Sequence, residues 1–162
     1  MTIELIKLSQ FSGNKAHFHT VVVNGEEDTL YTKFVKEHIA SHPDELRDMM
    51  TRMYVMGHSQ GAREPFFKMS EGTATDNVVA LFDRPDKHLR LYCLRYGNTV
   101  ILGGGGAKST RTYQESPQLH SSVKLLQRIS KIIDEAIKNK ELIIDDEGKI
   151  ICEQILDDYE DD

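Results

Sequence analysis

The sequence has no hydrophobic run of membrane length and almost no cysteine. Its longest apolar runs, such as Val21–Val23 and Val78–Phe82, fall far short of the about 20 residues that a membrane-spanning helix needs. Met1–Gln10 carries an early acidic residue and lacks the apolar stretch of a signal peptide. Cys93 and Cys152 form no CxxC pair, which is typical of idle thiols in a reducing compartment. We therefore expect a cytoplasmic protein with no membrane partner.

The composition is that of an ordinary globular protein. The chain has 162 residues, of which 39% are hydrophobic and 28% are charged, and it contains no evident internal repeat. This length is enough to bury one sizeable core. We expect a single α+β domain over residues 1–156, followed by a frayed acidic tail over residues 157–162.

Charge is distributed unevenly along the chain. The net charge is −6, but ten acidic residues and one basic residue lie between Glu141 and Asp162. The rest of the chain is therefore mildly basic. Between Arg84 and Tyr113 there are six basic residues and one acidic residue. A concentrated basic segment of this kind is typical of proteins that contact nucleic acid.

The order of hydrophobic patterns predicts the fold class. We expect leading strands and two helices, then an antiparallel β-meander and a long C-terminal helix. The expected strands cover residues 2–8, 17–23, 77–82, 89–95 and 99–102, with a small hairpin over 143–155. The expected helices cover residues 30–40, 43 to about 56, and 116 to about 140.

The stretch ILGGGGAKST, residues 101–110, has the look of a phosphate-binding loop. Lys108-Ser109 fits the end of the G-x-x-x-x-G-K-[ST] motif, but Leu102 and Ala107 occupy the positions of its two glycines. The segment after it is also not the opening of a helix. We expect instead a bulged strand end whose glycines let the backbone bend or a ligand approach, and which presents Lys108 to a site.

A series of local features, in a fixed order, resembles the central part of the RelE/HigB-type toxins of bacterial toxin–antitoxin systems. The resemblance covers about Pro65 to Ala136. The matching pieces are Phe67-Lys68, Glu71-Gly72, Val78–Leu81, Leu89–Tyr92, Gly97, Val100–Leu102, Gly106–Lys108 and Pro117.

The resemblance implies a compact RelE-like fold and cleavage of mRNA, in many members on the ribosome, by a protein that a cognate antitoxin neutralises. It also implies no cofactor and no metal ion. The ribose 2′-oxygen attacks the neighbouring phosphate, so a base, a phosphate-stabilising cation and an acid are required. The catalytic candidates are Arg90, Lys108, Lys68 and Tyr113. The candidates for binding RNA are Arg84, Arg95, Tyr92 and Arg111.

Histidine offers a weaker signal. His17 and His19 lie two residues apart on one strand face and could bind a metal ion, but no acidic or cysteine partner lies near them in sequence. The remaining histidines that lie in expected loops or helix starts are expected at the surface: His42, His58, His88 and His120.

A second function stays open beside the ribonuclease. The acidic net charge and the lack of an obvious terminal His/Tyr acid–base pair favour a non-catalytic α+β binding or interaction module, either a degenerate member of the toxin fold or an unrelated protein.

Overall fold

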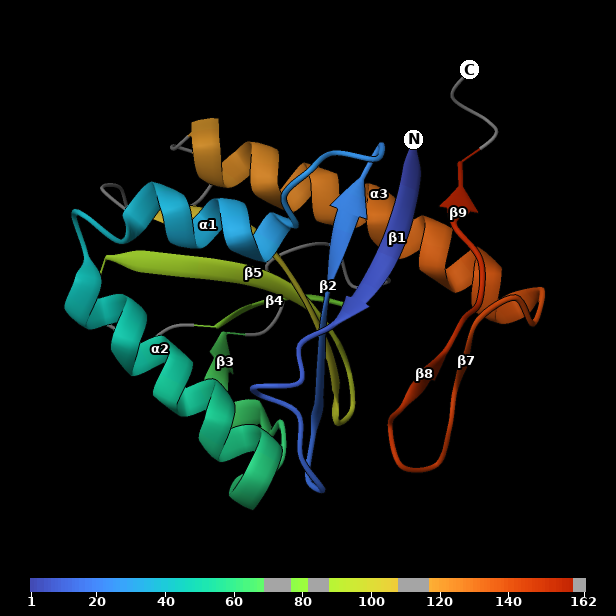
Figure 1. Cartoon of the computed structure of the whole chain (residues 1–162), viewed down its shortest axis with the longest axis horizontal. Coiled ribbons are helices and arrows are strands. Elements are labelled where there is room, and N and C mark those ends of the chain that lie inside the picture. The colour runs from blue at the N-terminus through green and yellow to red at the C-terminus, as the bar shows by residue number, and fades with distance from the viewer. Residues whose placement is uncertain (69–76, 82–87, 108–116, 159–162) are drawn as a thin grey trace.

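The chain folds as the mixed α+β protein that the sequence predicts. A computed structural model describes residues 1–68, 77–81, 88–107 and 117–158 (Figure 1). Its strands are β1 (Thr2–Lys7), β2 (His17–Val23), β3 (Phe67–Lys68), β4 (Val78–Leu81), β5 (Leu89–Tyr96), β6 (Thr99–Ala107), β7 (Ile143–Ile144), β8 (Ile150–Ile151) and β9 (Leu156–Asp157). Its α-helices are α1 (Leu30–His38), α2 (Pro43–Val55) and α3 (Pro117–Lys138), and a π-helical turn over Met56–Gln60 and a 3-10 turn over Glu64–Phe66 follow α2.

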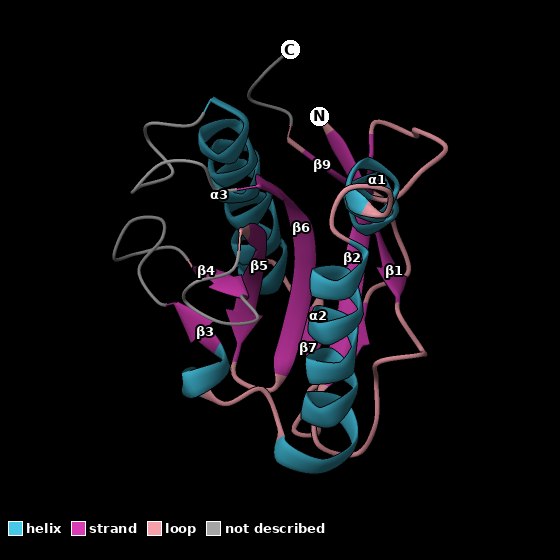
Figure 2. Ribbon diagram, turned by 90° about the vertical axis from the view of Figure 1, so that its left-hand side faces the viewer, coloured by secondary structure: helices cyan, strands magenta, loops and turns pink. Residues whose placement is uncertain are grey.

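Seven strands form one sheet in the order β3-β4-β5-β6-β2-β1-β9, and β7 and β8 form a separate hairpin. All neighbouring pairs in the large sheet are antiparallel except β2 and β6, which are parallel. Helices α1 and α2 cover one face of the sheet and α3 covers the other (Figure 2). The parallel pair joins the leading hairpin to the predicted β4-β5-β6 meander, so both halves of the chain belong to one sheet.

Each face of the sheet has its own core. On β5, Leu89, Leu91 and Cys93 pack in the cluster that includes the side chains of α1 and α2. Tyr92 and Leu94 pack in the cluster that includes α3. The two sets alternate along the strand because successive side chains of a strand point to opposite faces. The centre of the sheet is therefore buried on both sides.

The four glycines lie inside β6, which runs to Ala107 rather than ending at residue 102 as the sequence predicts. A bulge in the pairing with β5 falls within the glycine run. A Cβ at Gly103 would lie 2.8 Å from the Leu126 side chain of α3, and one at Gly105 would lie 1.8 Å from the carbonyl oxygen of Arg90. Only glycine permits these approaches. The glycine run therefore allows α3 and β5 to pack closely against β6.

The C-terminal segment returns to the sheet. Strand β9 pairs with β1, and the Asp157 carboxylate lies 3.6 Å from the Met1 amino group. Asp158 accepts a hydrogen bond of 2.9 Å from Arg128 of α3. The acidic tail predicted over residues 157–162 thus begins with two docked residues, and residues 159–162 lie outside the described part of the chain.

Helix α3 is the longest helix, with 22 residues and a strongly one-sided apolar face. That face packs on the sheet, and the opposite side carries charged residues. Among the residues that the structure describes, no helix has both the length and the apolar character needed to cross a membrane.

Candidate functional site

Three of the predicted site residues share the face of the sheet that α3 covers. Lys68 pairs with Ala80, and Ala80 pairs with Tyr92, so the three form one row across β3, β4 and β5. Arg90 is two residues from Tyr92 on the same strand. Arg90 is only 7% exposed and Tyr92 only 2% exposed, whereas Lys68 is exposed. The guanidinium Nη1 of Arg90 donates to the carbonyl oxygen of Leu89 at 2.9 Å.

The burial of Tyr92 bears directly on its predicted role. Stacking on an RNA base requires an accessible ring face, and the ring of Tyr92 packs in the core formed with α3. Contact with RNA would therefore require α3 to move away from the sheet. In the structure, Tyr92 packs between the sheet and α3, and Arg90 is buried on the same face of β5.

Arg95 lies apart from these three residues, on the opposite face. Its Nε donates to the carbonyl oxygen of Ala62 at 2.9 Å, and its guanidinium lies 5.8 Å from the centre of the Phe67 ring. These contacts fasten the segment after α2 to the sheet. The other predicted site residues, Arg84, Lys108, Arg111 and Tyr113, lie outside the described residues.

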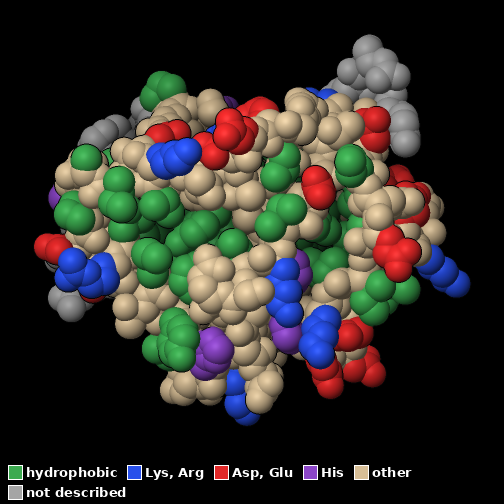
Figure 3. Space-filling model, in the orientation of Figure 1, with side chains coloured by type: hydrophobic (Ala, Val, Ile, Leu, Met, Phe, Trp, Pro, Cys, Tyr) green, Lys and Arg blue, Asp and Glu red, His purple; other side chains and the backbone are tan. Residues whose placement is uncertain are grey.

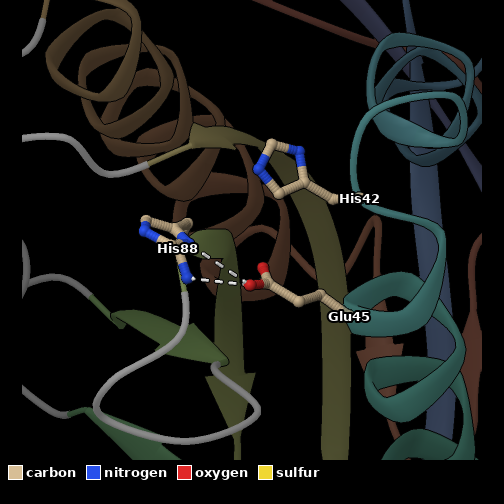
Figure 4. A group of neighbouring side chains, drawn as sticks. All are labelled: His42, Glu45 and His88. Atoms are coloured by element: carbon tan, nitrogen blue, oxygen red, sulfur yellow. Dashed lines mark hydrogen bonds and ion pairs between the residues drawn. The ribbon is translucent and has the colours of Figure 1, made fainter.

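A different group of polar side chains meets where β5 begins. His42 immediately precedes α2, Glu45 lies in the first turn of α2, and His88 immediately precedes β5. Their potential ligand atoms all lie within 4.8 Å of one another. Figure 4 shows one ring nitrogen of His88 facing the Glu45 carboxylate, with the His42 ring beside them. We refer to these three residues as the His–Glu–His cluster.

Glu45 anchors the cluster to the sheet. Its two carboxylate oxygens accept hydrogen bonds from the backbone N–H groups of His88 (3.2 Å) and Leu89 (2.9 Å). Burial alone would raise the pKa of Glu45, but the hydrogen bonds from Leu89 and His88 and the nearby charge of His42 outweigh it and lower the pKa. Glu45 is therefore a carboxylate that stays ionised and is held in one orientation.

Glu45 and Ser41 orient the two imidazoles. The Nδ1 atom of His88 lies 3.5 Å from Glu45 Oε1, and the other ring nitrogen points away from the carboxylate (Figure 4). His88 is 65% exposed, so that second nitrogen can meet a ligand. Nδ1 of His42 lies 2.8 Å from the Ser41 hydroxyl, and the centres of the His42 and His88 rings are 6.1 Å apart.

The cluster combines the groups needed for two kinds of chemistry. Two imidazoles of this spacing can give and take protons on either side of one substrate group, and the carboxylate can orient the His88 ring. Two imidazoles and one carboxylate are also a common ligand set for divalent transition-metal ions.

Sequence reasoning predicted His42 and His88 at the surface but did not bring them together. Forty-six positions separate them, and no local pattern connects a helix start to a distant strand start. The one available signal was Glu45. A glutamate at the third helical position often bonds back to a Ser or Thr N-cap. Here the N-cap is His42, and its side chain makes no capping hydrogen bond. The Glu45 carboxylate bonds to the start of β5 instead.

The pair that the sequence did single out lies in a different environment. His17 and His19 are 6% and 5% exposed, and the Nδ1 atom of each is buried without a hydrogen-bond partner among the described residues. Burial, reinforced by the charge of Lys7, lowers the pKa of both, and that of His19 falls to about 4. Both imidazoles are therefore held neutral, and metal binding there would require the β7–β8 segment to open, since Gly148 lies against His17.

The face that carries α1 and α2 is not basic. Figure 3 shows hydrophobic side chains gathered over its left and centre, partly in hollows, while charges of both signs are scattered around its margin. No continuous basic surface lies on this face among the described residues. In the sequence, basic residues flank the cluster instead: Lys87 directly precedes His88, and Lys108 directly follows Ala107, the partner of Leu89.

Comparison of the chain with protein-family models, curated proteins and solved structures gives no match. Function is therefore inferred from the residues of this chain and from their geometry.

Proposed function

We propose that this protein is a metal-independent endoribonuclease of the RelE/HigB type that cleaves mRNA. The observation that carries the proposal is the meeting of two imidazoles, His42 and His88, beside an ionised carboxylate, Glu45. This arrangement supplies an acid–base pair in a sequence that has no obvious terminal His/Tyr pair.

Two further observations support the proposal. From Val78 to Lys138 the elements follow the order that the resemblance implies, which is three strands of a meander and a helix that starts at a proline. The basic segment of the sequence, between Arg84 and Tyr113, includes the start of β5 where His88 lies. Cations beside an acid–base pair suit a polyanionic substrate.

The proposed reaction gives each of the two rings one proton transfer. His42 accepts the proton of a ribose 2′-hydroxyl, and the 2′-oxygen forms a bond to the adjacent phosphorus. His88 donates a proton to the leaving 5′-oxygen as the P–O5′ bond breaks, leaving a 2′,3′-cyclic phosphate and a 5′-hydroxyl. His88 is assigned as the acid because its Nδ1 lies 3.5 Å from the Glu45 carboxylate and its other ring nitrogen points away from it (Figure 4).

The predicted catalytic cations take different roles in this proposal. Arg90 acts as a positioning residue because it is buried between β5 and α3. Stabilisation of the charged phosphorane is assigned to Lys108, with Arg84 and Arg111 binding the RNA backbone and Tyr113 binding a base. Lys68 is exposed and contributes to binding of the backbone. The partners are then mRNA, which many members of this family cleave on the ribosome, and an antitoxin that covers the site.

The test is cleavage of mRNA by the full chain in a bacterial cell-free translation reaction, which offers both free and ribosome-bound message. The wild-type protein should cut the message and leave 2′,3′-cyclic phosphate ends. His42→Ala and His88→Ala should each lower the rate by about 10²- to 10⁴-fold, the usual contribution of a general acid or base.

His58→Ala is the matched control. His58 is exposed like His88, but it stacks on Tyr54 at the far end of α2. Its replacement should leave cleavage unchanged. Intact message with soluble wild-type protein, or equal rates for all three variants, would contradict the proposal.

A second candidate function is a non-catalytic interaction module. It is favoured by the exposed hydrophobic side chains of Ile39, Met50 and Tyr54 on α2 and next to α1, on the face without a basic surface. This function predicts that the wild-type protein leaves the message intact in the same reaction, and that Tyr54→Ala weakens its binding to a partner protein.

A further inference from the structure

We infer that the His–Glu–His cluster binds one divalent transition-metal ion of the Zn²⁺ class, and that the bound ion switches off acid–base chemistry at this site. The metal site stands on the geometry of the cluster alone, whereas the inhibitory role rests on the proposed function.

The ligand set fits such an ion. Imidazole nitrogens and a carboxylate oxygen suit Zn²⁺ and its neighbours in the first transition row, whereas Mg²⁺ and Ca²⁺ prefer sets made of oxygen. The three ligand atoms lie within 4.8 Å of one another. Bonds of about 2.0–2.1 Å in a tetrahedral site bring ligand atoms to about 3.4 Å from one another, which small rotations of the two imidazoles can achieve.

The surroundings orient the ligands in the way that metal sites require. The backbone N–H groups of His88 and Leu89 hold the Glu45 carboxylate, and Ser41 contacts Nδ1 of His42. His42 would then bind through Nε2. Hydrogen bonds of this outer shell fix the tautomer and direction of a ligand. Water would complete the coordination, because the chain supplies three ligands and His88 is exposed.

Metal binding and proton transfer compete at the same atoms. In the structure, Nδ1 of His88 faces the Glu45 carboxylate (Figure 4), so an ion bound by both groups would occupy the ring nitrogen that faces Glu45. His42 would give its lone pair to the metal and could not accept a proton from a 2′-hydroxyl. An ion at this site therefore removes the base and the acid together.

The first measurement is titration of the metal-free full chain with ZnCl₂ by isothermal calorimetry, without RNA, in a non-chelating buffer at neutral pH. One ion should bind per chain. His42→Ala and His88→Ala should each weaken binding by at least about tenfold, since even loss of an outer-shell partner costs about 10- to 100-fold in metal affinity. His88 is exposed, so its replacement does not endanger the fold.

Two controls separate this site from other ligands. His58→Ala and Cys152→Ser should leave the affinity unchanged, because neither residue belongs to the cluster. Absence of Zn²⁺ binding by the wild-type chain, or equal affinity in the wild type and in the His42→Ala and His88→Ala variants, would overturn the metal site.

The second measurement is mRNA cleavage by the same protein with and without saturating Zn²⁺. Inhibition over the concentration range of the calorimetric titration supports the switch. Unchanged or faster cleavage with the site saturated overturns it. No cleavage by the metal-free protein would contradict the proposed function and the switch together, while the calorimetry decides the metal site separately.

Discussion

Two pairs of histidines in this protein have similar chemistry and opposite environments. His17 and His19 are neighbours on β2 and are sealed in the protein. His42 and His88 come from distant parts of the chain, and they meet beside Glu45 at the start of β5. The first pair was the more conspicuous in the sequence, but the second is the one that can meet a ligand.

The difference lies in what surrounds each ring. The buried pair has unpartnered Nδ1 atoms and lowered pKa values, mainly because burial disfavours the charged form. In the other pair, His88 is exposed and His42 is half-buried, and they have a carboxylate and a hydroxyl within reach. A histidine therefore becomes a functional candidate through its partners and its exposure, and spacing along a strand does not supply either.

The largest expected effect is a loss of mRNA cleavage on replacement of His42 and His88 but not of His17. The double variant His42→Ala/His88→Ala should lose at least about 10²- to 10⁴-fold in mRNA cleavage while keeping the urea midpoint of the wild type. His17→Gln should keep the cleavage rate and shift the urea midpoint. Loss of cleavage in His17→Gln at a wild-type midpoint would reverse the assignment of the two pairs.

The next effect is the response of stability to acid. The pKa of His19 is about 4 in the folded chain and 6.5 as the reference value. Between these values the unfolded chain binds a proton that the folded chain does not, so stability falls as the pH falls. Between about pH 7 and about pH 4.5 the loss should be roughly 2–3 kcal/mol.

Urea unfolding at both pH values checks this prediction. His19→Gln removes the titrating group and should reduce the acid loss by that amount relative to the wild type. An identical loss in the two proteins would show that His19 titrates normally, and that the pair is more accessible than its burial indicates.

A smaller effect concerns the Glu45 carboxylate beside His42 and His88. Glu45→Gln keeps one acceptor oxygen but leaves a backbone N–H of His88 or Leu89 without its partner. It should cost about 1–2 kcal/mol in the free energy of unfolding at neutral pH. Because the pKa of Glu45 is lowered in the folded chain, the cost should shrink as the pH falls below its ordinary value.

The control for Glu45→Gln is Asp44→Asn. Asp44 is the adjacent, exposed acid, and its carboxylate lies 3.9 Å from Arg47 within the same helix. Its replacement should change stability by less than about 0.5 kcal/mol. Equal costs for the two substitutions would mean that Glu45 does not anchor α2 to the sheet.

The smallest effect concerns the cover over the buried pair. The Thr99 hydroxyl donates to the carbonyl oxygen of Gly148 at 2.6 Å and fastens the β7–β8 hairpin over His17. Thr99→Val should cost about 1 kcal/mol and speed hydrogen exchange in the hairpin. Thr51→Val, which removes an exposed bond within α2, should leave exchange in the hairpin unchanged.

Local patterns predicted most of the fold. Alternation along β5 and the apolar stripe of α3 repeat within a few residues, so the sequence displays them directly. The end of β6 was predicted five residues too early because glycines usually interrupt strands. Here they remain in the strand, since Leu126 of α3 and the carbonyl oxygen of Arg90 approach too closely for a side chain. Both contacts are between residues far apart in the sequence, so no local sequence pattern predicts them.

The candidate site was less predictable for the same reason. Arg90 was predicted as a catalytic residue from the resemblance of Leu89–Tyr92 to the toxin family, and only the packed structure reveals that it is buried. His42, Glu45 and His88 meet because α2 lies across the start of β5, so long-range packing creates their proximity. The roles predicted for Lys108 and Tyr113 stay predictions.

The most direct test is single-turnover cleavage of an RNA whose scissile 5′-oxygen is replaced by sulfur. A thiolate leaves without protonation, so loss of the general acid no longer slows the reaction, while loss of the general base still does. We predict that His88→Ala regains the wild-type rate on the sulfur substrate and that His42→Ala stays slow. Equal rates for wild type, His42→Ala and His88→Ala on the ordinary RNA would contradict the assignment of this cluster as the active site.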